Sequence, residues 1–128
     1  MVMKAPQNPT VIPINPVQNK NVILFAPELS DFIRKKGKVK TYRFDSEKYK
    51  HLKVGDQIEL REYGTNILIS RATIVDIKRV KFKDLPLKME GHEVYESKEH
   101  QRRVFSSYYR YLNRSIEDSD YFLVISLN

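Results

Sequence analysis

The chain has 128 residues, of which 41% are hydrophobic and 30% are charged, and it carries a formal net charge of +7. This length and composition predict one folded domain with its own core and exclude a chain that is disordered throughout. The absence of cysteine excludes disulfides and thiolate metal sites, while the basic balance favours an anionic partner, with nucleic acid as the first candidate.

The first twenty residues hold four of the six prolines. These prolines interrupt any continuous apolar core of the signal-peptide type, and no run approaches the ~18 apolar residues of a membrane span. We therefore expect a soluble, cytoplasmic protein that does not use a membrane. Residues 1–20 are predicted to be an extended arm, which either lies across the domain or a partner or is unstructured, and residues 21–128 are predicted to form the domain.

The predicted domain begins with a strand followed by a helix. Residues 21–26 form a short apolar run that predicts a buried strand. Pro27 suits the first position of a helix, and the apolar residues after it repeat at a spacing of three and four, so residues 27–36 should form a short amphipathic helix. Gly37 is expected to end this helix.

The middle of the chain has the alternation and turn residues of strands. We expect a polar loop at residues 45–53 and a turn at 63–66. The long segment loses its alternation near Ser70-Arg71, which predicts a bulge there. The predicted strands are 40–44, 57–62 and 67–82.

The last third of the chain contains the strongest helix pattern, at residues 97–112, and a closing strand at 120–127 that is apolar on both faces. A helical turn is expected near 84–86. The resulting order is β-α-β-β-β-α-β with short hairpin turns. This order predicts an α+β fold, a small mixed β-barrel of about five to six strands with two to three flanking helices.

Several segments together resemble the ASCH domain, a branch of the PUA-like superfamily. The resemblance begins with Lys38-x-x-Thr41-x-Arg43 and covers about residues 22–127. The family usually has one residue between its glycine and this lysine, whereas here they are adjacent, so Lys36 and Lys40 are alternatives for the position. The other matching segments are Val54-Gly55-Asp56, Phe82-x-x-Leu85, Glu90-Gly91, the helix after it and the strand Phe122-Leu123-Val124-Ile125.

The resemblance implies a PUA-like barrel with a cleft for RNA or a modified nucleoside. Some ASCH proteins resemble RNA binders or coactivator modules, and others are small amidohydrolases that deacetylate N4-acetylcytidine with a lysine, a threonine and a glutamate. In this chain those three roles would fall on Lys38, Thr41 and Glu90.

The residues themselves also favour nucleic-acid binding. Segment 34–53 has nine lysines and arginines against two acidic residues, and tyrosines are interleaved with them. Thr41 and Arg43 should share one face of their strand, because side chains two apart point the same way. The alternative is that Tyr42 faces the core and the lysines are solvated. The predicted nucleic-acid contacts are Lys36, Lys38, Lys40, Thr41, Tyr42, Arg43 and Arg79.

Whether the protein is an enzyme stays open at this point. A lysine whose pKa is lowered by burial and neighbouring cations suits a base, Thr41 a nucleophile and Glu90 a proton carrier. The three histidines are scattered, so no metal is expected, and there is no phosphate-loop glycine pattern, so no cofactor is expected. A third possibility is a protein-interaction module that uses the Pro-rich arm. The sequence leaves the oligomeric state open.

Overall fold

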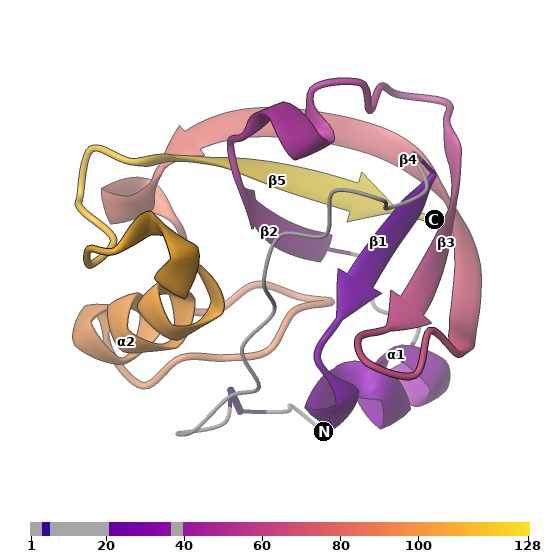
Figure 1. Cartoon of the computed structure of the whole chain (residues 1–128), viewed down its shortest axis with the longest axis horizontal. Coiled ribbons are helices and arrows are strands. Elements are labelled where there is room, and N and C mark those ends of the chain that lie inside the picture. Colours follow the sequence, from indigo (N-terminus) through magenta and orange to yellow (C-terminus); the bar gives the residue numbers. More distant parts are fainter. Residues whose placement is uncertain (1–3, 6–20, 37–39) are drawn as a thin grey trace.

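The strands form a single mixed sheet in the order β1-β3-β4-β5-β2 (Figure 1). The computed structural model describes residues 4–5, 21–36 and 40–128. β1 runs parallel to β3, and the other neighbouring strands are antiparallel. The strands are β1 (Val22–Phe25), β2 (Lys40–Phe44), β3 (Gln57–Glu62), β4 (Leu68–Lys81) and β5 (Tyr121–Leu127).

Two α-helices accompany the sheet, α1 (Ser30–Lys36) and α2 (Lys98–Tyr108). A 3-10 turn at Pro27–Leu29 leads into α1. The side chain of Ser97 caps α2, because its Oγ accepts a hydrogen bond from the backbone N–H of His100 at 3.0 Å. Shorter 3-10 turns lie at Glu47–Tyr49, Phe82–Asp84 and Arg110–Leu112.

The prediction of a closed barrel is wrong: in the described residues the sheet is open, with β1 and β2 as its two edge strands. The reason lies in the backbone of β2. The N–H of Lys40 already donates to the carbonyl of Gly91, and the N–H of Phe44 donates to the hydroxyl of Tyr109. Donors that are occupied in this way are no longer available to a second strand. The α+β class and the five strands agree with the prediction.

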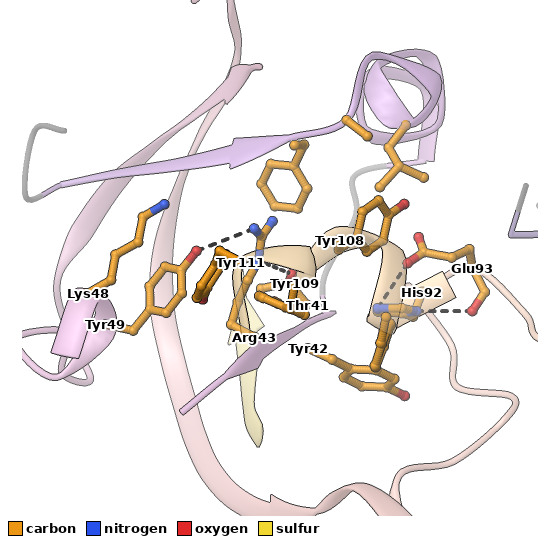
Figure 2. A pocket seen from close by; sticks show the side chains of 14 residues that line it. Thr41, Tyr42, Arg43, Lys48, Tyr49, His92, Glu93, Tyr108, Tyr109 and Tyr111 are labelled. Carbon is orange, nitrogen blue, oxygen red and sulfur yellow. Dashed lines mark hydrogen bonds and ion pairs between the residues drawn. The ribbon is translucent and has the colours of Figure 1, made fainter. Parts of the chain in front are cut away.

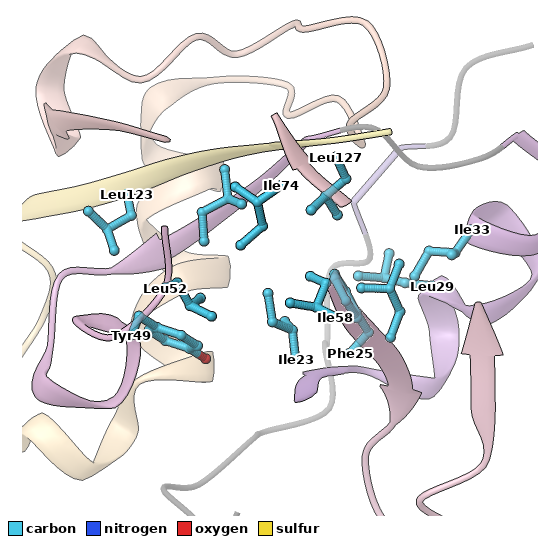
Figure 3. Packing of buried hydrophobic residues seen from close by; sticks show 12 residues of the cluster. Ile23, Phe25, Leu29, Ile33, Tyr49, Leu52, Ile58, Ile74, Leu123 and Leu127 are labelled. Atoms are coloured by element: carbon cyan, nitrogen blue, oxygen red, sulfur yellow. The ribbon is translucent and has the colours of Figure 1, made fainter. Parts of the chain in front are cut away.

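Both faces of β5 are buried, as predicted, because a separate apolar cluster covers each face. One cluster lies between the sheet and α1 and includes Leu123 and Ile125 of β5, together with Ile33 of α1 (Figure 3). The other cluster lies beside α2 and includes Phe122 and Val124. Alternate residues of one strand thus enter opposite cores, as the two-residue period of a strand requires.

The element order and the bounds of β2 and β3 match the predictions from the sequence. The predicted bulge is present, with Ile69 as the extra residue opposite β3, and β4 has a second irregularity at Val75. The helix predicted at residues 97–112 ends as an α-helix at Tyr108, and a 3-10 turn follows it.

Two further predictions fall largely outside the described residues. These are the helix stop at Gly37 and the arm at residues 1–20, of which only Lys4 and Ala5 are described. The N–H of Ala5 donates to the carbonyl of Val94 at 3.0 Å. In the part of the chain that the structure covers, neither helix has the length and apolar character needed to cross a membrane.

Candidate functional site

A cavity of about 40 Å³ lies between the two edge strands, where the sheet stays unpaired (Figure 2). The end of β1 contributes Phe25 to its wall, and β2 contributes residues 41–43. The other walls come from the turn at 47–49, from residues 92–93 and from the C-terminal end of α2. Five separate segments of the sequence therefore meet at the gap between β1 and β2.

Thr41 and Arg43 lie side by side in this cavity, as the strand alternation predicted. The Nε–H of Arg43 donates to Thr41 Oγ1 at 3.1 Å, and both side chains are buried. The guanidinium carbon lies 4.5 Å from the centre of the Phe25 ring, and Nη1 is 3.5 Å from the hydroxyl oxygen of Tyr49. The guanidinium is thus held by an aromatic face and two hydroxyls.

The cationic end of the cavity has no acidic partner among the described residues. Of the described carboxylates, none lies within 4.0 Å of a side-chain nitrogen of Arg43 or Lys48. The Lys48 ammonium lies 5.6 Å from the centre of the Tyr49 ring. Burial, and after it the charge of Arg43, lowers the pKa of Lys48. Two positive charges therefore share a partly desolvated space.

The opposite end of the cavity is acidic. His92 Nε2 lies 3.2 Å from Glu93 Oε1, the hydroxyl of Tyr95 donates to the same oxygen at 3.2 Å, and all three side chains are buried. Burial, followed by the Glu93 charge, raises the pKa of Tyr42, Tyr95 and Tyr108. These phenols therefore stay protonated and neutral at any physiological pH.

Three tyrosines close the cavity from the end of α2 and the turn after it (Figure 2). Tyr109 is buried and holds the edge of β2, since its hydroxyl accepts the N–H of Phe44 at 3.1 Å. Tyr108 and Tyr111 are half-buried. The rings of Tyr109 and Tyr111 lie 6.1 Å apart and nearly perpendicular. The rim of the cavity is therefore aromatic and partly open to solvent.

The other predicted contact residues of β2 and β4 are placed differently. Lys40 does not line the cavity, and its Nζ donates to Ser126 Oγ at 2.8 Å. Tyr42 does line the cavity, but it is buried and its ring stacks on His92 at 4.0 Å, so the ring is not presented to solvent as a stacking surface. The Nε–H of Arg79 donates to Asp45 at 2.6 Å, on the exposed side of β4.

The proposed acid and base residues are only partly brought together. Glu90 is exposed and does not line the cavity, whereas Glu93, three residues later, does. Lys38 and the side chain of Lys36 lie outside the described residues. The site predicted from the sequence left out Glu93, His92 and Lys48. The signal for Glu93 was its position beside Val94 and Tyr95, since a carboxylate in an apolar stretch is a candidate for burial.

In the ranges 4–5, 21–36 and 40–128, no group of three or more histidine, aspartate or glutamate side chains is placed to hold a metal ion.

Comparison with known proteins gives one informative match. Neither a family model nor a curated protein sequence matches the chain. The fold is similar to a solved structure described as the high resolution crystal structure of an ASCH domain from Lactobacillus crispatus JV V101, with a TM-score of 0.59 and 14% identity. The match covers 79% of this chain and 69% of that one. At this level of identity the similarity concerns the fold alone.

Proposed function

We propose that this chain, which has an ASCH-like fold, binds RNA or a modified nucleoside in the cavity between β1 and β2. The observation that carries the proposal is the composition of that cavity. A buried guanidinium and a lysine stand at one end, and tyrosine rings form the rim. Aromatic and cationic side chains in one concave site are the features that single-stranded nucleic acids use.

The half-buried rings of Tyr108 and Tyr111 support the aromatic part of the proposal. A base has a π-face whatever its identity, so it can stack on such a ring without a sequence preference. The enclosed volume of about 40 Å³ holds only a few water-sized groups. Part of a nucleotide would therefore enter the cavity, and the remainder would lie against the rim.

Binding of a short single-stranded RNA, followed by fluorescence anisotropy, tests the proposal. Replacing Tyr108 or Tyr111 by leucine should weaken binding about 5- to 150-fold, which corresponds to 1–3 kcal/mol for one stacked base. Tyr111→Phe keeps the ring and should bind as the wild type does. Tyr63→Leu is the matched control, because Tyr63 is half-buried but does not line the cavity. Wild-type affinity in both leucine variants would contradict the proposal.

A second candidate function is hydrolysis of an acylated nucleoside in the same cavity. The observation that favours it is that Thr41 and Glu93 both line the cavity, one with a hydroxyl and the other with a carboxylate. Amide hydrolysis needs a nucleophile, a proton carrier and a base. In this proposal Glu93 takes the role that the sequence gave to Glu90, and Lys38 keeps the role of the base.

Incubation with N4-acetylcytidine, with release of cytidine as the readout, tests this second candidate. Glu93→Gln and Lys38→Ala should abolish turnover, and Glu90→Gln should leave it unchanged because Glu90 is exposed away from the cavity. If the wild type releases no cytidine, the hydrolase proposal ends while the binding proposal stands.

A further inference from the structure

We infer that the end of the cavity formed by Arg43, Lys48 and Tyr49 is a phosphate site. It follows that the ligand is a nucleotide, either free or within RNA, and that an uncharged nucleoside binds less tightly. This inference rests on the proposed function and narrows it, since that proposal leaves both kinds of ligand open.

The first argument is the buried charge of Arg43. Arg43 is only 8% exposed, yet no described carboxylate lies within 4.0 Å of its guanidinium nitrogens. A charge that is withdrawn from water is costly unless an opposite charge or good hydrogen bonds compensate it. A neutral phenol and a threonine hydroxyl compensate it only in part. An anionic ligand would supply the missing charge.

The second argument is the number of donors that Arg43 keeps available. A guanidinium has five N–H groups in a planar fork. The Nε–H is used by Thr41, and one N–H of Nη1 points to Tyr49 across 3.5 Å. The other three have no hydrogen-bond partner among the described residues and remain for a ligand, and the Phe25 ring, whose centre is 4.5 Å from the guanidinium carbon, restricts movement of the fork. A fixed fork of this kind matches two oxygens of a phosphate.

The third argument is that the neighbouring groups can also donate. The hydroxyls of Thr41 and Tyr49 each accept from Arg43, so each keeps its own hydrogen for an anion. Lys48 adds a second positive charge; burial, and to a smaller extent the charge of Arg43, lowers the pKa of Lys48. A phosphate between them would offset the repulsion of the two cations, and a terminal monophosphate, with up to two negative charges, would match both of them.

The acidic end of the cavity determines which way round a nucleotide would bind. Glu93 lies at the end away from Arg43 and Lys48 (Figure 2). Its carboxylate repels a phosphate and accepts hydrogen bonds from neutral N–H and O–H groups. The phosphate should therefore lie at Arg43, and the uncharged part of the nucleotide should extend toward the tyrosine rim.

Calorimetric titration of the full chain at low salt tests the phosphate site. The probes are cytidine, adenosine, their 5′-monophosphates, inorganic phosphate and a short single-stranded RNA. We expect each monophosphate to bind at least about tenfold more tightly than its nucleoside, and inorganic phosphate to compete. Arg43→Gln and Lys48→Gln should remove this tenfold difference.

Lys50→Gln is the matched control. Lys50 is exposed, already donates to Glu47 at 2.7 Å and does not line the cavity, so this variant should keep the tenfold difference. If Arg43→Gln fails to fold, Lys48→Gln alone decides, because Lys48 is half-buried at the edge of the site.

The outcomes separate the inference from the proposed function. Equal affinity for nucleoside and monophosphate overturns the phosphate site and leaves the proposed function intact. Arg43-dependent binding of inorganic phosphate without binding of any nucleoside, nucleotide or RNA supports the phosphate site and overturns the proposed function. No binding of any probe overturns both. Arg43-dependent binding that is tighter for the RNA than for the monophosphates supports the site and identifies an internal phosphate as its ligand.

Discussion

At the scale of single residues, three consecutive side chains of β2 serve two different environments. Thr41 and Arg43 interact with one another in the cavity, while Tyr42, which also lines it, belongs to the cluster beside α2. The alternation of a strand produces this division without any special backbone geometry. Thr41 also stabilises the fold, whether or not it contacts a ligand, because its hydroxyl accepts a hydrogen bond from the Nε–H of buried Arg43.

Thr41→Val should therefore destabilise the fold. Valine has nearly the same shape, but it leaves the Nε–H of Arg43 without an acceptor in a buried place. The expected loss in free energy of unfolding is about 1.5–3 kcal/mol, the value of a hydrogen bond to a charged group. Urea denaturation measures it. Thr41→Ser retains the hydroxyl and serves as the control. A Thr41→Val protein as stable as the wild type would show that the bond contributes nothing.

At the scale of elements, the connection from α2 to β5 is held by ion pairs. The two terminal nitrogens of Arg114 donate to the two oxygens of Asp120, each at 2.8 Å, and the N–H of Glu117 donates to Asp120 at 2.7 Å. Asp120 immediately precedes β5, the strand that is buried on both faces. The same connection follows the tyrosine rim, so Asp120 helps to position both the sheet and the cavity wall.

Asp120→Asn should lower the stability of the fold at neutral pH. It should also reduce the loss of stability that occurs when the pH is lowered. The hydrogen bonds from Arg114 lower the pKa of Asp120 below its usual range. A group with a lowered pKa stabilises the folded state above its unfolded pKa, and this contribution is lost as the pH falls through its folded pKa. The wild type should therefore lose stability below about pH 4.

The expected cost of Asp120→Asn at pH 7 is about 1 kcal/mol, since the partner Arg114 is partly exposed and solvent screens the pair. Thermal unfolding between pH 7 and pH 2.5 measures both effects. The variant should lose less stability than the wild type below pH 4, but it should keep some acid dependence from Asp118, whose pKa is also lowered. Parallel stability curves for the two proteins would contradict the role given to Asp120.

At the scale of the whole molecule, the positive charges differ in whether they are already paired with a carboxylate. The net charge is +7. Some cations are already paired on the surface, as Arg79 is with Asp45 and Lys50 is with Glu47. Arg43 and Lys48 are not paired with any described carboxylate. Attraction of a polyanion would come from the field of the whole protein, whereas its position would depend on the cavity.

Affinity for single-stranded RNA should fall steeply as salt rises. Each neutralised phosphate adds about −0.7 to the slope of log affinity against log salt, so roughly three contacts would produce a slope near −2. Anisotropy titrations between low and moderate salt measure the slope. Binding of an uncharged nucleoside serves as the control and should change little. RNA affinity that is the same at both salt concentrations would rule out contacts to the phosphate backbone.

The sequence by itself determined the elements and their local geometry. The bounds of β2 and β3, the order of strands and helices, and the shared face of Thr41 and Arg43 all follow from periodicity and from turn residues. These features depend on interactions between residues that are close in the chain, and such local patterns can be recognised directly in the sequence.

Only the tertiary structure decided where the sheet stays open and which side chains meet there. Tyr109 reaches the edge of β2 across 65 positions of sequence, and Glu93, which the sequence analysis did not name, lines the cavity, whereas Glu90 does not. Contacts of this kind depend on how distant segments pack, and nothing in the local pattern of either segment encodes the other. The elements were therefore predictable, but the opening of the sheet and the full set of side chains that line the cavity were not.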